Sequence, residues 1–168
     1  MSTSESAPGK LIVMDRTLVI GYGNPLRGDD ALGFLAAERL ARTIADPAVT
    51  VMPVHQITPE LAEPISRAAR VIFIDACVGP EVGKIVERTV HVALPAASAF
   101  THHASPEGIL AVALALYGRA PEAWLFSVAG ADFSYSAEPS PALAQRVESV
   151  AAAVLRRIGP VASDRRAL

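Results

Sequence analysis

Short apolar runs and amphipathic helical patterns alternate along this chain, and no other feature limits its possible folds as strongly. The apolar runs are typical of buried β-strands and lie at residues 17–23, 49–54, 70–76 and 123–128. The stretches between them carry the spacing of helices with one apolar face, at residues 31–44, 59–69, 108–118 and 141–158. Strands that alternate with helices in this way predict an α/β three-layer sandwich, with helices on both faces of a mostly parallel sheet.

One further strand, expected at residues 83–92, differs from the others because its polar and apolar residues alternate with period two. Such alternation is typical of an exposed edge strand. The link from the strand at 70–76 is too short for a crossover, so we expect these two strands to form an antiparallel pair. Pro64 is expected to kink the helix at 59–69.

Composition and charge exclude several classes of protein. The 168 residues suit one domain, which we expect over residues 11–160, between disordered tails at 1–10 and 161–168. The net charge is −2 and the sequence has no run of lysine or arginine, which argues against a nucleic-acid or anionic membrane partner. Cys77 is the single cysteine, and the sequence has neither a signal peptide nor an apolar run of roughly 18–20 residues. These features predict a cytoplasmic chain without membrane insertion.

The segment GYGNPLRGDD, residues 21–30, joins the first strand to the first helix and ends in two adjacent carboxylates, Asp29 and Asp30. A single carboxylate is enough to cap a helix, so the other is free for a second role, and Asp30 is the candidate. A dinucleotide-binding fingerprint needs glycine where this chain has Leu26, which argues against a nicotinamide cofactor and an oxidoreductase.

Two further segments bring reactive side chains to the same edge of the predicted sheet. Asp75 ends the most apolar strand, where a buried carboxylate needs hydrogen bonds from the next loop, a helix terminus, a cation or a metal. His102 and His103 precede the helix at 108–118, where each alone is most simply a solvated loop residue. Two carboxylates and one imidazole at one edge would form a site suited to a divalent metal such as nickel or zinc.

Other residues carry weaker signals. The sequence contains no nucleophile elbow, no zinc-protease helix motif and no phosphate-binding loop. We expect an inert apolar role for Cys77, polar loop positions for His55 and Gln56, an exposed edge position for His91 and a core position for Trp124.

The segments GYGNPLRGDDALG, VIFIDA and THHASPEGILAVALALYG together resemble the hydrogenase maturation protease family, and the similarity covers residues 17–158. The resemblance implies a five-stranded α/β fold. It also implies an endopeptidase that removes a short C-terminal extension from the large subunit of [NiFe]-hydrogenase after nickel insertion. By motif, the metal-binding residues of the family fall on Asp30, Asp75 and His103. Counting back from residues 116–118 selects His103 over His102, and Ala31 stands where the family often has glycine.

This resemblance also suggests how the chain would recognise its partner, the hydrogenase large-subunit precursor. Three ligands are too few to hold nickel tightly, but they can complete a coordination sphere that the substrate began. Nickel of the substrate, or another divalent metal in its place, is therefore the expected recognition handle for a monomeric enzyme. Asp30 or Asp75 is the expected base, and polarisation of the scissile carbonyl by the metal is the alternative.

Two other functions stay open from the sequence. One is a nickel-binding or chaperone module on the same fold that cleaves no bond. The other is a peptidase of this fold that acts on a different C-terminal tail. The nickel-binding module differs from a protease in that it releases no peptide. The peptidase with another substrate is distinguished by whether a hydrogenase large-subunit gene lies beside the gene for this chain.

Overall fold

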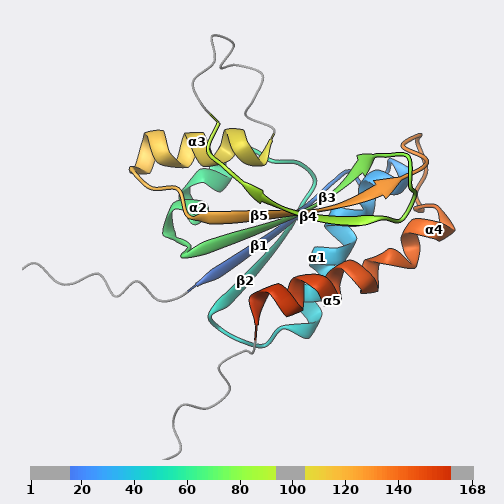
Figure 1. Cartoon of the computed structure of the whole chain (residues 1–168), viewed down its shortest axis with the longest axis horizontal. Helices are drawn as coiled ribbons and strands as arrows, with labels where there is room; N and C mark the ends of the chain where they lie inside the picture. Colours follow the sequence, from blue (N-terminus) through green and yellow to red (C-terminus); the bar gives the residue numbers. More distant parts are fainter. Residues whose placement is uncertain (1–15, 94–104, 160–168) are drawn as a thin grey trace, which may run out of the picture.

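The computed structural model describes residues 16–93 and 105–159 (Figure 1). The tails expected at 1–10 and 161–168 lie outside the described residues, as do His102 and His103. The strands are β1 (Thr17–Tyr22), β2 (Val49–Val54), β3 (Arg70–Val78), β4 (Ile85–Val90) and β5 (Glu122–Gly130). The α-helices are α1 (Leu32–Thr43), α2 (Ala62–Arg67), α3 (Pro106–Tyr117), α4 (Pro141–Ala144) and α5 (Arg146–Ile158). The 3-10 helices η1 (Gly28–Ala31) and η2 (Pro59–Leu61) precede α1 and α2.

Within the described residues, the five strands form one sheet in the order β2-β1-β3-β5-β4. The first four strands of this order run parallel, and β4 is antiparallel to β5 at the edge. The α/β sandwich with one antiparallel edge strand, which the sequence predicts, is therefore confirmed.

The expected pairing of β3 with β4 is wrong, because β5 lies between them. The six residues 79–84 that link β3 to β4 can span two strand spacings, about 10 Å, so a slot stays open between the two strands. The apolar β5 fills this slot and pairs with β3 over nine residues. The polar β4, whose central residues are exposed, is left at the edge.

Alternation along the strands divides the core into two layers. Leu18, Ile20 and Phe73 pack against α2 and α3 on one face of the sheet. Val19 and Ile72 point the other way, toward α1 and α5. Figure 1 shows α2 and α3 on one side of the sheet and α1 and α5 on the other.

The helix boundaries follow local chemistry. The Ser105 side chain accepts a hydrogen bond from the Gly108 backbone N–H at 3.1 Å, which caps α3, and Gly118 ends this helix with φ of 69°. Pro64 does not kink a long helix, as the sequence suggested, because η2 precedes a short α2. Pro64 falls in the first turn of α2, where a backbone N–H has no partner within the helix. No helix among the described residues is long and apolar enough to cross a bilayer.

Candidate active site

Tyr22 and Asp75 meet at the edge of the sheet where the parallel strands β1 and β3 end. These strands are neighbours, and Tyr22 follows Ile20 by two positions as Asp75 follows Phe73. Because side chains alternate along a strand, Tyr22 and Asp75 lie on the same face of the sheet, the one covered by α2 and α3. The Tyr22 hydroxyl donates a hydrogen bond to the Asp75 carboxylate.

The environment of Asp75 changes its acidity. Burial raises the pKa of the Asp75 carboxyl to about 7. Hydrogen bonds from the Tyr22 hydroxyl and the Ala76 backbone N–H stabilise the ionised form but do not outweigh burial, and the charge of Asp30 raises the pKa further. Burial, and after it the charge of Asp75, raise the pKa of Tyr22, so the phenol keeps its proton. Asp75 is therefore suited to exchange a proton near neutral pH.

Asp30 lies in η1, directly before α1. Its Oδ2 accepts a hydrogen bond from the Asn24 backbone N–H at 2.7 Å, and Asn24 Oδ1 accepts one from the Leu26 backbone N–H at 2.9 Å. These bonds close the β1–α1 loop on itself. The field of Asp30 reaches Asp75, so the structure brings the two predicted carboxylates to one edge of the sheet.

Asp29, the neighbouring carboxylate, serves the fold instead. Its side chain is 0% exposed and accepts hydrogen bonds from the backbone N–H groups of Ala131, Asp132 and Ser140 at 2.7, 3.0 and 2.7 Å. The Ser140 hydroxyl donates to it as well, at 3.0 Å. Burial alone would raise the pKa of Asp29, but these hydrogen bonds lower it below its ordinary value. The Asp29 carboxylate thus holds the β5–α4 loop in place. It does not cap a helix, since no side chain caps η1.

The glycines of the motif let the β1–α1 loop pack closely against the sheet. A Cβ atom on Gly21 would lie 2.0 Å from the carbonyl oxygen of Gly33, and one on Gly23 would lie 1.8 Å from the carbonyl oxygen of Asp30. Gly23 also has φ of 147°, a conformation that other residues rarely adopt. This close approach brings η1, and with it Asp30, to the ends of β1 and β3.

The start of α3 adjoins the same edge. The charge of Glu107, in the first turn of α3, acts on Tyr22, and the Ala93 backbone N–H donates to the Glu107 carbonyl at 3.2 Å. His102 and His103 precede Ser105 in the sequence, but the structure does not describe their positions. In residues 16–93 and 105–159, no group of three histidine, cysteine or acidic side chains is placed to hold a metal ion.

Tyr22 is the site residue that sequence analysis did not single out. The alternation of Leu18, Ile20 and Tyr22 along one strand carries the signal, because it puts the phenol on a known face at the end of β1. Placing it beside Asp75 also requires the order of the strands, in which β3 lies next to β1.

The weaker candidates take peripheral positions. Burial and the charge of Asp75 raise the pKa of the Cys77 thiol, which disfavours the thiolate that a nucleophile needs. His55 is exposed beside the ring of Phe34, with 5.2 Å between ring centroids, and His91 is exposed as expected. Trp124 is only half-buried, since the Arg157 guanidinium covers its ring at 4.1 Å from the centroid.

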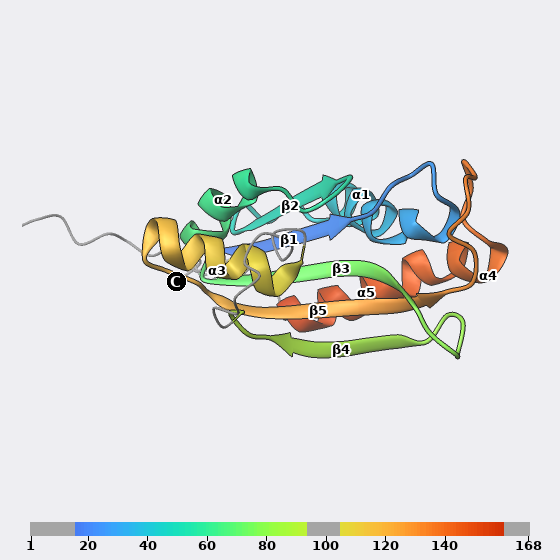
Figure 2. The same cartoon turned by 90° about the horizontal axis from the view of Figure 1, so that it is seen from above.

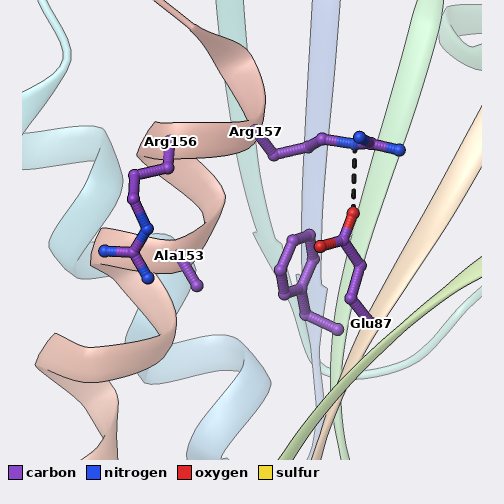
Figure 3. Close-up of a pocket in the computed structure, with 5 residues that line it drawn as sticks. Glu87, Ala153, Arg156 and Arg157 are labelled. Carbon is purple, nitrogen blue, oxygen red and sulfur yellow. Dashed lines mark ion pairs between the residues drawn. The ribbon is translucent and has the colours of Figure 1, made fainter.

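A hollow of about 290 Å³ lies on the other face of the sheet, between α5 and the strands β4 and β5. Figure 3 shows the Arg157 side chain reaching from α5 to Glu87, an ion pair with an Nε–Oε1 distance of 3.1 Å. The floor residue Phe126 belongs to the core layer beneath α1 and α5. This hollow is therefore separated by the sheet from Asp75 and Tyr22.

Solved structures of similar fold include several peptidases that mature hydrogenases. The [NiFe] hydrogenase maturation protease HycI from Thermococcus kodakarensis is 26% identical, with a TM-score of 0.69 over 83% of this chain and 90% of that chain. The hydrogenase maturating endopeptidase HybD from Escherichia coli is 24% identical, with a TM-score of 0.67 over 86% of this chain and 94% of its own. A hydrogenase 2 maturation peptidase from a Thaumarchaeota archaeon is 20% identical, with a TM-score of 0.64 over 86% and 98%.

No protein-family model matches the sequence, and no curated protein matches it either. The assignment therefore depends on the fold, which these peptidases share over most of their length, and on the loop that carries Gly21, Gly23, Asn24, Asp29 and Asp30. In its fold and in this loop, the chain is therefore similar to the hydrogenase maturation proteases.

Proposed function

We propose that this chain is an endopeptidase that removes the C-terminal extension of a [NiFe]-hydrogenase large-subunit precursor after nickel insertion. The observation that carries the proposal is the buried Asp75 carboxyl, whose pKa is raised to about 7, beside Asp30 at the open edge of the sheet. The similar structures named above are maturation peptidases of hydrogenases, which supports this substrate over other C-terminal tails.

The two carboxylates fit a divalent cation. Asp30 and Asp75 repel each other, and Asp75 is buried, so a cation that both carboxylates face would stabilise their ionised forms. We infer that this cation is the nickel of the precursor, with His103 as a third ligand; another divalent metal can take its place. These three ligands would bind the nickel-loaded precursor in preference to the nickel-free precursor, because they complete the coordination sphere that the substrate's own ligands leave incomplete.

In the proposed reaction, Asp75 is the base. Its carboxylate takes a proton from the attacking water while the water oxygen forms a bond to the scissile carbonyl carbon. The carboxyl group then returns a proton to the amine as the peptide C–N bond breaks. The hydroxyl of Tyr22 holds the carboxylate in one orientation throughout. The substrate's nickel, when bound, supplies Lewis acidity at the same edge.

The test is the intact mass of a purified large-subunit precursor before and after incubation with this chain. We expect the nickel-loaded precursor to lose one C-terminal peptide and the nickel-free precursor to keep it. Asp75→Asn should leave both forms uncut, whereas the exposed Leu116→Ala should process like the wild type. Equal cleavage of both precursors would exclude nickel recognition. Nickel binding without cleavage of either would identify a nickel-binding module instead.

A further inference from the structure

Two loops at the carboxyl edge of the sheet each expose one large apolar side chain. Leu26, in the β1–α1 loop, is 58% exposed, and Tyr135, in the β5–α4 loop, is 86% exposed. Figure 2 shows these loops next to each other at the end of the sheet, and a parallel bridge between Arg27 and Ser136 joins them. We call Leu26 and Tyr135 together the apolar rim.

The backbone beneath the apolar rim is fixed. The Ser136 N–H donates to the Leu26 carbonyl at 3.1 Å, and the Gly28 N–H donates to the Ser136 carbonyl at 3.0 Å. The buried Asp29 carboxylate holds the start and the end of the β5–α4 loop through the hydrogen bonds described above. Because this backbone is already held in place, binding a partner through the two side chains costs little further backbone entropy, which favours a role as binding anchors.

The apolar rim is continuous with the candidate active site. The β1–α1 loop carries Leu26 on its exposed side, while its Asn24 N–H binds the carboxylate of Asp30 at 2.7 Å. A molecule that covers Leu26 therefore touches the loop that places Asp30 at the end of β3.

The position of the apolar rim also indicates the size of its partner. The two loops lead into α1 and α4, whose Leu32 and Leu143 are buried on the α1/α5 face of the sheet. Asp75 lies toward the opposite face. A partner that occupies both places must reach across the edge of the sheet, which a folded protein does more readily than the short segment that is cut.

We propose that Leu26 and Tyr135 are specificity-determining residues, which bind an apolar patch on the folded body of the protein substrate beside its cleavage site. The inference rests on the proposed function. Burial of an aromatic and an aliphatic anchor at the centre of a contact contributes a large share of binding energy, so the substrate's body would bind here while its tail enters the site.

The test compares steady-state processing of the nickel-loaded precursor by the wild type and by the double variant Leu26→Ala/Tyr135→Ala. We expect the double variant to raise KM about tenfold and to change kcat less than twofold, because truncation of two anchors weakens docking without touching the reacting groups. The single variant Tyr135→Phe keeps the ring and should restore most of the affinity that Tyr135→Ala loses.

A matched control is available in the same chain. Leu116→Ala/Tyr117→Ala truncates an aliphatic and an aromatic side chain that are 67% and 50% exposed at the end of α3, so it removes a similar apolar surface away from the rim. We expect the KM of this control to stay within twofold of the wild type. If the wild type cleaves the precursor and both double variants share its KM, the inference is wrong and the proposed function stands. If the wild type releases no peptide, both are wrong.

Discussion

Two aspartates, the buried Asp29 and the half-buried Asp75, lie at the same edge of the sheet and differ in their hydrogen bonds and acidity. Asp29 is enclosed by donors from the β5–α4 loop, and its pKa is lowered. Asp75 faces the Tyr22 hydroxyl and the Ala76 N–H, and its pKa is raised to about 7 because burial outweighs these bonds. A carboxylate whose charge is matched by hydrogen bonds holds loops together, whereas one whose charge is poorly matched stays reactive.

The first and largest expected effect is the loss of processing in Asp75→Asn. The amide keeps the shape of the side chain but cannot take a proton from water, so we expect kcat for the nickel-loaded precursor to fall about a thousandfold. The measurement is the rate of peptide release by mass spectrometry, with circular dichroism to confirm the fold. Retention of more than a tenth of the wild-type rate would remove Asp75 from the role of base.

Asp29→Asn should instead reduce stability. The new amide places a donor against backbone N–H groups of Ala131, Asp132 or Ser140, so we expect the free energy of unfolding to fall by about 2–3 kcal/mol. Urea unfolding measures this change, and Asp132→Asn, at an exposed position of the same loop, is the control. Processing per folded molecule should change far less than in Asp75→Asn, and a loss equal to that variant's would make Asp29 a site residue.

These two regions also show what the sequence could and could not predict. The β-α alternation and the apolar strand before Asp75 predicted the layers of the fold and the edge at which Asp30 and Asp75 meet. The choice between Asp29 and Asp30 was made from a general argument on caps. Asp29 is structural because it accepts hydrogen bonds from residues 131–140, about a hundred residues away along the chain. Such tertiary contacts cannot be predicted from a local sequence pattern.

Strand pairing shows the same limit. The short link between β3 and β4 correctly indicated opposite directions, but local connectivity does not reveal that a later strand enters between them. The apolar character of β5 against the polar β4 was the available signal, because a central strand is buried on both faces. Tyr22 was missed for a related reason, since its contact with Asp75 depends on which strands are neighbours.

The pH dependence of stability should have opposite signs for the two aspartates. Folding raises the pKa of Asp75 from 3.8 to about 7, so the free energy of unfolding falls as pH rises through this window and the cost is complete above it. Asp75→Asn removes this cost. The full change in pKa corresponds to about 4 kcal/mol, and water that reaches the half-buried carboxyl reduces the gain that we expect between pH 4 and pH 8 to about 2 kcal/mol.

Folding lowers the pKa of Asp29, so its contribution is present above pH 3.8 and is lost as the pH falls through its lowered value. The loss of free energy of unfolding in Asp29→Asn, relative to the wild type, should therefore become smaller at acidic pH. Urea unfolding of the metal-free variants from pH 3 to pH 8 measures both trends. A constant difference between Asp75→Asn and the wild type across this range would contradict the raised pKa of Asp75.

The smallest expected effect is that of Tyr22→Phe. This substitution measures how far the acidity of Asp75 depends on the Tyr22 hydroxyl. The Tyr22 hydroxyl stabilises the ionised Asp75, so its loss should raise the pKa of Asp75 further and leave less carboxylate at neutral pH. Because kcat/KM reports the free enzyme, we expect kcat/KM to fall about tenfold at pH 7 and to recover toward the wild-type value at pH 9, while stability changes by less than about 1 kcal/mol. A deficit of equal size at both pH values would mean that Tyr22 orients Asp75 without setting its acidity. An unchanged pH profile and an unchanged rate would show that burial alone makes Asp75 differ from Asp29.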